Sequence, residues 1–552
     1  MTQHGSTLGS AAHPQERLEF DYVIVGAGSA GCVLAARLSE DPSVSVCLLE
    51  AGGTHERAVL DCPGGLALMA HIKAVNWDFH TEPQMGLGGR RGYQPRGKVL
   101  GGSSSINAMI YVRGHPSDYD DWAAEGNPGW SWSQVLPYFK RAEDNSRGAS
   151  QWHGSQGPLS VSDLMHPHRI AADFIRAGQS AGYPLTDDFN GTQQEGFGFF
   201  QVTQRQGQRC STARAYLDNA RQRPNLTVLS GARVLHLTFD PGNPRQATGV
   251  RVWIEQRQVE VRARAEVLIC AGALMSPQLL MVSGIGDAAH LHAHGVDVVH
   301  HLPGVGRHLH DHIDVVQVVK APALHDVFGL SLRGAARVAH GAWQWMRHRR
   351  GVLTTNYAEA GAFLRSQPEV SRPDIQLHFV VAQLIDHGRQ TLWGHGYSCH
   401  VCVLRPRSRG QVKLLSADPL AAPSIDPAFL THPDDVDLLV RGFTQMRQVL
   451  QQPALTQHGG QETERSSYAR TPQQIEEFVR RTADTIYHPV GSCRMGPGPL
   501  DVVDAQLRVH GVGRLRVVDA SVMPHIVGGN TNAPTIMVAE KAADMIRGRL
   551  SA

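Results

Sequence analysis

Residues 20–31 read Phe20-Asp21-Tyr22-Val23-Ile24-Val25-Gly26-Ala27-Gly28-Ser29-Ala30-Gly31. The apolar, β-branched run predicts a buried strand, and the G-x-G-x-x-G pattern that ends it passes directly into the helix-like stretch 32–38. Residues 44–49 predict a second strand, which closes on Glu50 and Ala51. Strand, glycine turn, helix and strand in this order predict a βαβ unit that binds a dinucleotide.

The glycines of this turn have separate physical roles. Gly26 permits a tight turn, Gly28 lets the backbone approach a pyrophosphate, and Gly31 allows the helix to pack closely on the strand. The free N–H groups of the helix N-terminus and its dipole favour the diphosphate. Glu50 follows Gly28 by 22 residues, where a carboxylate accepts hydrogen bonds from the ribose and repels the 2′-phosphate of NADP. The motif by itself leaves NAD and FAD open.

A second glycine-rich stretch lies at 97–107 and reads Gly97-Lys98-Val99-Leu100-Gly101-Gly102-Ser103-Ser104-Ser105-Ile106-Asn107. Its small residues, hydroxyls and carboxamide can wrap a long cofactor, with backbone amides facing phosphate or the polar edge of a ring. A flexible linker is the alternative. The linker is disfavoured because an apolar run with Asn107 and Arg113 follows at once.

This stretch resembles the first signature of the glucose–methanol–choline (GMC) flavoprotein oxidoreductases. The second signature is present at 272–286, the histidine segment at 487–496, and two further landmarks at 517–524 and 529–535. These landmarks run from about residue 20 to residue 545 in the order of the family. Coincidence is therefore not a serious alternative.

The resemblance implies FAD as the cofactor. The backbone of Val234 would meet the adenine end, Asp519 and Ala520 the pyrophosphate, and Pro534 and Thr535 the isoalloxazine. The full set of implied FAD-binding residues is Gly26, Gly28, Ser29, Ala30, Gly31, Glu50, Ala51, Trp77, Val99, Gly101, Ser103, Asn107, Ala108, Met109, Ile110, Val234, Asp519, Ala520, Asn532, Pro534 and Thr535.

Some family members attach the flavin through a histidine in the first signature. Ile106 holds that place here, immediately before Asn107, so the resemblance implies noncovalent FAD.

A catalytic pair is implied near the C-terminus. Loss of a hydroxyl proton during hydride transfer requires a base, and histidine needs the least perturbation to act near neutral pH. Among 30 histidines, His488 lies in the catalytic segment of the family. Its partner is placed at Asn530, with Asn532 as the alternative if the register slips by two. Asparagine cannot act as a base, so Asn530 would hold and polarise the hydroxyl.

The activity implied is FAD-dependent oxidation of a primary alcohol to the aldehyde, with electrons passed to a quinone-type acceptor. The chain resembles bacterial choline dehydrogenases and aliphatic alcohol dehydrogenases, and we expect an uncharged alcohol because a quaternary ammonium needs an aromatic and acidic cage. An oxygen-using alcohol oxidase, a choline dehydrogenase, and a hydroxynitrile lyase with an idle flavin stay as alternatives. Fatty-acid photodecarboxylases and a nonenzymatic scaffold are disfavoured by the retained His488.

The expected fold is α/β, with a Rossmann-like FAD-binding domain and a second domain built on an antiparallel sheet. We expect a loose tail at 1–19, the FAD-binding domain at 20–315, the substrate domain at 316–480, and a returning C-terminal segment at 481–552 that completes the flavin site. Residues 374–379 alternate in hydropathy and predict a strand on the substrate side.

Composition argues against a nucleic-acid-binding protein and against a disulfide-rich protein. The chain has 552 residues, 41% of them apolar and 18% charged, and its 57 glycines need turns and close backbone approaches. A net charge of +2 argues against a nucleic-acid partner. Eight scattered cysteines predict a reducing cytoplasm rather than a disulfide framework.

Two short patterns suggest a metal, and we expect none. Cys399-x-x-Cys402 lies in a run that predicts a strand, and no second cysteine pair completes a zinc site. The run His310-Asp311-His312 has no evident third ligand.

No apolar run approaches the ~18 residues of a spanning helix. Residues 329–351 nevertheless combine leucine and tryptophan with five arginines. That composition is typical of an amphipathic helix lying on a membrane surface, which would make the protein peripheral on the inner membrane face. The alternative is an ordinary surface helix whose arginine side chains extend along it.

Overall fold

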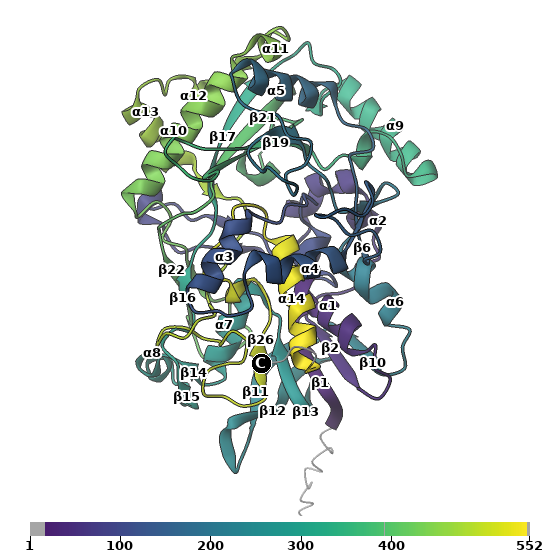
Figure 1. Cartoon of the computed structure of the whole chain (residues 1–552), viewed down its shortest axis with the longest axis vertical. Coiled ribbons are helices and arrows are strands. Elements are labelled where there is room, and N and C mark those ends of the chain that lie inside the picture. Colours follow the sequence, from purple (N-terminus) through teal and green to yellow (C-terminus); the bar gives the residue numbers. More distant parts are fainter. Residues whose placement is uncertain (1–16, 391, 549–552) are drawn as a thin grey trace, which may run out of the picture.

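The computed structural model describes residues 17–390 and 392–548. Two large sheets lie at opposite ends of an elongated molecule (Figure 1). The lower sheet has seven strands and is mainly parallel near the N-terminal strand, whereas the upper sheet has eight antiparallel strands. The predicted α/β class with a second, antiparallel sheet is confirmed.

The seven-stranded sheet is built around the predicted βαβ unit. Strands β10, β2, β1 and β13 are parallel neighbours, β26 extends β13 in parallel, and β12 and β11 complete the sheet as antiparallel strands. All five residues of β2 are buried, as expected for a parallel strand covered on both faces. The bounds are Arg17–Val25 for β1, Val46–Glu50 for β2, Leu226–Ser230 for β10, Arg233–Asp240 for β11, Asn243–Ile254 for β12, Arg257–Ile269 for β13 and Leu515–Val517 for β26.

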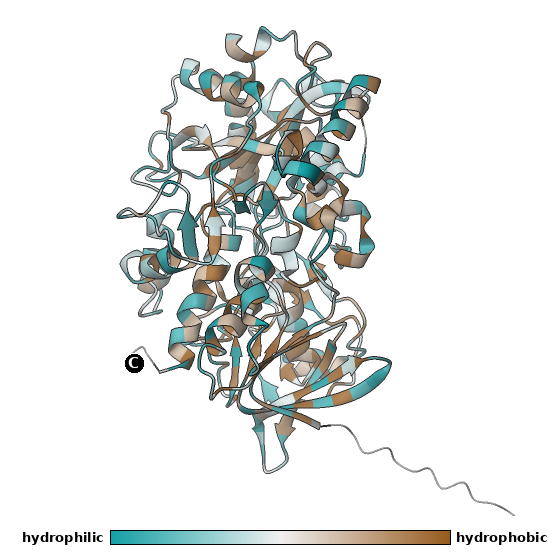
Figure 2. Ribbon diagram, turned by 90° about the vertical axis from the view of Figure 1, so that its right-hand side faces the viewer, coloured by the Kyte–Doolittle hydropathy of each residue, from teal (hydrophilic) through white to brown (hydrophobic). Residues whose placement is uncertain are grey.

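Figure 2 shows apolar residues concentrated along the strands of this sheet. The expected tail at 1–19 is too long by three residues, because β1 begins at Arg17 and pairs with β13 from Glu260 onward. Residues 1–16 of that tail lie outside the described residues.

The two ends of the chain pack together beside this sheet. Helix α1 (Ser29–Leu38) lies against α14 (Asn532–Ile546), and α14 also contacts α4 (Trp132–Ala142) (Figure 1). The buried carboxylate of Glu540 on α14 joins them, because it pairs with Arg37 of α1 at 2.8 Å and with Arg141 of α4 at 2.8 Å. The C-terminal segment therefore returns to the N-terminal nucleotide motif.

The eight-stranded sheet has the order β24-β17-β21-β20-β19-β7, with β18 and β25 pairing at its margins. Helices α5 (Arg169–Ser180) and α10 (Pro433–Leu450) pack on it around an apolar core that includes Phe174, Phe379 and Phe443. The bounds are Gly196–Phe199 for β7, Ile313–Lys320 for β17, Gly329–Leu330 for β18, Ala358–Leu364 for β19, Ile375–Val380 for β20, Gly394–Val403 for β21, Gln461–Glu462 for β24 and Asp484–Thr485 for β25.

The strand expected at 374–379 is confirmed as β20. Cys399 and Cys402 lie as buried free thiols on β21, the strand that their sequence run predicted. The division into domains at 315/316 and 480/481 stays a prediction. The second sheet itself draws on residues outside 316–480, since β7 pairs with β19 and β17 begins at Ile313.

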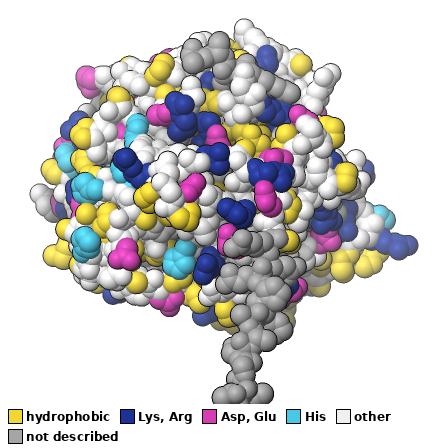
Figure 3. All heavy atoms as spheres, turned by 90° about the horizontal axis from the view of Figure 1, so that it is seen from below, with side chains coloured by type: hydrophobic (Ala, Val, Ile, Leu, Met, Phe, Trp, Pro, Cys, Tyr) yellow, Lys and Arg dark blue, Asp and Glu magenta, His cyan; other side chains and the backbone are white. Residues whose placement is uncertain are grey.

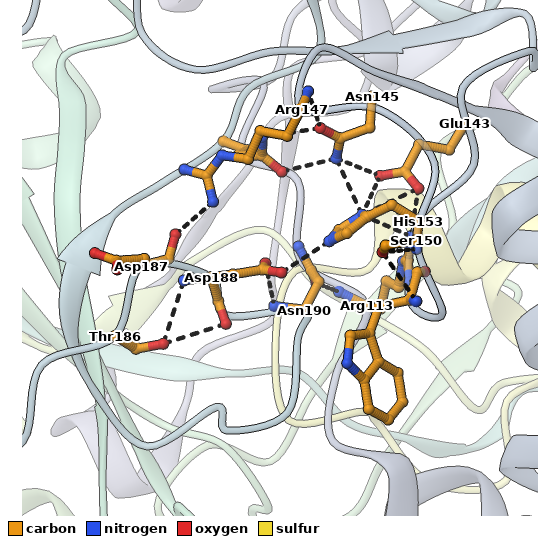
Figure 4. Close-up of polar contacts among 12 residues, drawn as sticks. Arg113, Glu143, Asn145, Arg147, Ser150, His153, Thr186, Asp187, Asp188 and Asn190 are labelled. Carbon is orange, nitrogen blue, oxygen red and sulfur yellow. Dashed lines mark hydrogen bonds and ion pairs between the residues drawn. The ribbon is translucent and has the colours of Figure 1, made fainter.

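A buried charged cluster follows the second glycine-rich stretch (Figure 4). Arg113 pairs with Glu143 at 2.6 Å, and His153 bridges Glu143 and Asp188 at 3.0 and 2.8 Å. Burial opposes charging of His153, but its hydrogen bonds to Asp188 and Glu143 outweigh burial and raise its pKa to about 9. The cluster therefore ties residues 113, 143–153 and 188 together through charge-assisted hydrogen bonds.

Basic and acidic side chains are interspersed on the end of the molecule that carries the seven-stranded sheet (Figure 3). Within the part of the chain that the structure describes, no helix has both the length and the apolarity needed to cross a bilayer. Residues 329–351 form β18 and then α9 (Leu332–His348), which runs along the outer edge of the molecule (Figure 1).

Candidate active site

A cavity of about 660 Å³ extends from the glycine turn of the first sheet to the inner strands of the second. Its wall includes His488 and Asn530, so the nucleotide motif and the catalytic segment share one space. The other predicted residues on the wall are Gly26, Gly28, Ser29, Ala30, Glu50, Ala51, Trp77, Ser103, Asn107, Ala108, Met109, Ile110, Val234, Asp519, Ala520, Asn532 and Thr535.

Four predicted cofactor-binding residues do not line this cavity. Two of them pack behind the residues that do. A Cβ on Gly31 would lie 1.9 Å from the carbonyl oxygen of Gly26, and the N–H of Gly101 donates to Ala27 O at 2.7 Å. The first contact lets α1 pack on the turn, and the second joins the two glycine-rich stretches. The four residues are Gly31, Val99, Gly101 and Pro534.

The nucleotide end of the cavity fits a diphosphate. Gly28 caps α1 without a side-chain hydrogen bond, and the first turn of α1 holds no acidic residue, so its N–H groups are free to meet an anion. Gly102 lies over this turn with φ +53°, and a Cβ there would stand 2.7 Å from the Cα of Gly28. The two glycine stretches therefore approach so closely that only bare backbone fits between them.

Glu50 and Asp519 are the acidic residues of this wall among the described residues. Glu50 accepts from the N–H groups of Ala27 at 3.0 Å and Gly52 at 2.8 Å, and burial raises its pKa to about 7. Asp519 accepts from Gly272 N at 2.8 Å and Ser276 Oγ at 2.5 Å. Each oxygen of Glu50 keeps a second lone pair for a ribose hydroxyl, and the FAD implied by the resemblance therefore fits this end.

At the other end, His488 Nε2 lies 3.2 Å from the Nδ2 of Asn530. Gln376 Nε2 donates to Asn530 Oδ1 at 3.3 Å, which turns the amide N–H₂ towards His488. Asn532 Oδ1 instead accepts from Ser29 Oγ at 2.7 Å, beside the nucleotide turn. The structure thus brings Asn530, rather than Asn532, to the predicted base.

The orientation of His488 is set from two sides. Its backbone N–H donates to Asp311 Oδ1 at 2.8 Å, and the residue before it, Tyr487, has φ +78°, an uncommon conformation for a bulky side chain. Its ring Nδ1 lies 3.0 Å from the Nδ1 of His312. Ring and backbone are therefore both anchored, and Nε2 remains on the cavity side.

His312 determines which ring nitrogen of His488 carries the proton. The Nε2 of His312 lies 3.0 Å from Leu404 O, an acceptor, so this nitrogen must donate. Burial lowers the pKa of His312 to about 4, which leaves its Nδ1 as a lone-pair acceptor. His488 Nδ1 therefore donates to it, and burial with the nearby His312 keeps the pKa of His488 well below its usual range. The free lone pair of His488 is on Nε2, beside Asn530.

His312, His378, Arg96 and Asp311 belong to this neighbourhood and were not predicted as site residues. His312 and Asp311 occur in the His310-Asp311-His312 run. In the sequence, the two histidines on either side of an aspartate suggested a metal site and no other role. Both ring nitrogens of His310 are already hydrogen-bonded: Nδ1 lies 2.7 Å from His308 O, and Nε2 accepts from Ile526 N–H at 2.9 Å. His378 lies in the alternating stretch 374–379 that predicted a strand on the substrate side, but nothing there marked it as a site residue, and no sequence signal distinguishes Arg96.

Comparison with known proteins identifies the family. The GMC oxidoreductase models match residues 20–314 and 406–539. The chain is 45% identical to an alcohol dehydrogenase [acceptor] of Pseudomonas putida over 96% of its own length and 95% of the relative. It is 43% identical to the mitochondrial choline dehydrogenase of Homo sapiens, covering 99% and 92% of the two chains.

Among solved structures, pyridoxine 4-oxidase from Mesorbium loti superposes with a TM-score of 0.85 at 32% identity, covering 96% of this chain and 100% of that one. Two matched family models and near full-length identity above 40% leave one assignment for the whole chain. The protein belongs to the GMC oxidoreductases, a family whose cofactor is FAD.

Proposed function

We propose that this enzyme oxidises a primary alcohol to the aldehyde with noncovalently bound FAD, and that His488 is the base. The observation that carries the proposal is the 3.2 Å distance between His488 Nε2 and Asn530 Nδ2, two residues on the wall of the cavity that begins at the nucleotide turn. Noncovalent attachment is supported by Ile106, because its side chain has no nucleophilic atom.

Oxidation of R–CH₂–OH removes a proton from oxygen and a hydride from carbon. Bound FAD supplies the acceptor for the hydride. His488 Nε2 takes the hydroxyl proton as the C=O bond forms, and Asn530 Nδ2 donates to the alcohol oxygen and holds it. His488 is ready for this step at neutral pH because burial lowers its pKa and keeps the ring uncharged.

The reaction can be tested by adding primary alcohols to the holoenzyme under argon and following the flavin absorbance. Bleaching with formation of the aldehyde supports the proposal, whereas cyanohydrin cleavage without bleaching would support the lyase alternative. His488→Ala is expected to keep bound FAD and to lower turnover by roughly 10²–10⁴-fold, as removal of an acid–base group does. Unchanged turnover would refute the role of His488.

We also propose that electrons leave to a quinone-type acceptor rather than to oxygen. The relative from Pseudomonas putida is named alcohol dehydrogenase [acceptor], which supports transfer to a separate acceptor. In air, reduction of a quinone analogue should outpace formation of peroxide. Peroxide in a one-to-one ratio with aldehyde would favour the oxidase.

A membrane is the proposed place of that exchange. Helix α9 turns an apolar stripe to solvent: Leu332, Trp343 and Met346 are 93%, 55% and 65% exposed, while Trp345 is buried on the opposite side and donates to Gly207 O at 2.7 Å. We call Leu332, Trp343 and Met346 the α9 face. Apolar side chains on the outward side of a helix suit the boundary between headgroups and acyl chains.

Charge and position support the same partner. The helix sequence contains no acidic residue, and Arg333 and Arg347 are exposed beside the α9 face, so a surface of anionic lipids is complementary to it. Leu330 and Val338 are 42% and 41% exposed and also line the cavity, and Val338 lies on the same side of α9 as Trp345, seven residues before it. An apolar acceptor dissolved in the bilayer would therefore find the cavity beside the contact.

A further inference from the structure

His378 is a buried histidine of the cavity wall that neither the flavin nor the proposed proton transfer uses. It lies on β20, is 3% exposed, and shares the cavity with His488 and Asn530. Neither ring nitrogen has a hydrogen-bond partner among the described residues. Burial lowers its pKa to about 3, so the ring is neutral and offers one N–H donor and one lone pair.

Five further polar side chains of the wall are incompletely paired among the described residues; besides Gln383 and Asn356 they are Arg96 (Nε), Gln278 (Oε1) and His400 (Nε2). The buried Oε1 and Nε2 of Gln383 have no partner among the described residues, and neither has the Oδ1 of Asn356. Buried polar groups are usually paired, because an unpaired one loses its hydrogen bonds to water without replacement. At the nucleotide end the polar atoms of Glu50 and Asp519 already bond to backbone. Apart from Gln278, which lies on α7 (Gly272–Val282) beside the seven-stranded sheet, the unpaired groups lie on the substrate side of the cavity.

The same end holds no fixed negative charge. The acidic wall residues of the described chain are Glu50 and Asp519, both at the nucleotide end. Arg96 lines the wall and donates to Tyr487 O at 2.9 Å, next to His488. Phe328 and Tyr357 offer aromatic surface with ring centroids 4.7 Å apart, but the carboxylate that would complete a cage for a quaternary ammonium is missing from this part of the wall.

We propose that His378 and Gln383 form a subsite for a second polar group of the substrate, so that the preferred alcohols are uncharged and carry a second hydroxyl or carbonyl. This inference rests on the proposed alcohol oxidation and names the class of alcohol. A hydroxyl placed there can accept from the N–H of the neutral His378 ring or donate to its lone pair, and a carbonyl can accept from the N–H. A site whose buried groups need partners rejects an analogue that lacks them.

The test compares straight-chain α,ω-diols of three to eight carbons with the 1-alkanols that have the same number of non-hydrogen atoms. kcat/KM is measured with a dye acceptor. We expect at least one diol to exceed its matched alkanol. His378→Leu should lower that diol-to-alkanol ratio by roughly 10- to 100-fold relative to wild type. Equal ratios in wild type and His378→Leu would overturn the subsite.

A matched control separates the subsite from general damage to the sheet. Gln317 on β17 is also buried with an unpartnered Oε1, but it does not line the cavity. Gln317→Leu should leave the diol-to-alkanol ratio unchanged, and Gln383→Leu should lower it. If Gln317→Leu lowers the ratio as much as His378→Leu, the subsite is also overturned.

Charge selectivity is tested with choline and its uncharged isostere 3,3-dimethylbutan-1-ol. The isostere should have the higher kcat/KM, because Arg96 and the lack of a carboxylate disfavour a cation. A higher value for choline would overturn the uncharged class. Failure of the underlying activity looks different, because then no alcohol of either series would bleach the flavin of the wild-type holoenzyme.

Discussion

The Nδ1 of His312 lies 3.0 Å from the Nδ1 of His488, and the other ring nitrogen of His312 donates to Leu404 O. This pair forces the proton of neutral His488 onto Nδ1 and leaves Nε2 free towards Asn530. In the proposed reaction His312 is thus a positioning residue: it would act on the alcohol only through the tautomer and the ring orientation of His488.

His312→Leu removes the acceptor for His488 Nδ1–H, so the ring can rotate or change tautomer. We expect FAD to stay bound and the rate of anaerobic flavin reduction to fall by roughly 10- to 100-fold, a part of the loss seen when an acid–base group is removed. His312→Gln offers an acceptor oxygen to His488 and an N–H₂ to Leu404, and should recover much of the rate. Equal losses in both variants would indicate a packing role only.

Gly102 should be required for the cofactor. A Cβ at this position would stand 2.7 Å from the Cα of Gly28, so Gly102→Ala forces the two glycine stretches apart. We expect the purified variant to have lost most of its flavin absorbance. Gly88→Ala is the matched control, because Gly88 has a similar φ of +64° but open space around its Cβ position. The left-handed backbone should destabilise both variants by about 1 kcal/mol, and only Gly102→Ala should lose FAD.

The contribution of His153 to the stability of the folded protein should be lost at alkaline pH. Its folded-state pKa of about 9 exceeds the ~6.5 of an unfolded histidine, so its contribution is full below pH ~6.5 and is lost as the pH rises through about 9. The difference in Tm between wild type and His153→Gln should therefore shrink between pH 7 and pH 10. The same comparison with His80→Gln, at an exposed site, should stay flat. A His153 difference that does not change with pH would contradict the charged bridge in the cluster of Figure 4.

The α9 face should hold the protein on anionic vesicles. Replacing Trp343 and Met346 together by serine should abolish cosedimentation with vesicles containing phosphatidylglycerol, and pure phosphatidylcholine vesicles should bind wild type more weakly. Activity towards a water-soluble dye should not change. Leu420→Ser removes a side chain that is 58% exposed elsewhere and should leave binding intact. Equal binding by the double variant and wild type would show that α9 does not contact lipid.

Local patterns were enough for the nucleotide end of the site. The strand 20–25, its glycine turn and Glu50 are contiguous or nearly so, and their spacing reflects the geometry of a single βαβ unit, which the structure reproduces as β1, α1 and β2. The signatures of the family added FAD and placed His488 and Asn530. The order of the landmarks also predicted that the C-terminal segment returns to the nucleotide motif, as α14 does beside α1.

The surroundings of the base were decided only by tertiary structure. His312 meets His488 across 176 positions of sequence, and His378 reaches the wall because β20 pairs in register with β21 and turns alternate side chains inward. The alternation at 374–379 separates His378 from the apolar face of Ile375, Leu377 and Phe379, but only the pairing of β20 with β19 and β21 brings that polar face to the cavity. The sequence by itself thus determined the cofactor motif and the family, because both depend on short contiguous segments. The proton position on His488 and the polarity of the substrate side depend on strands that meet only in the folded chain.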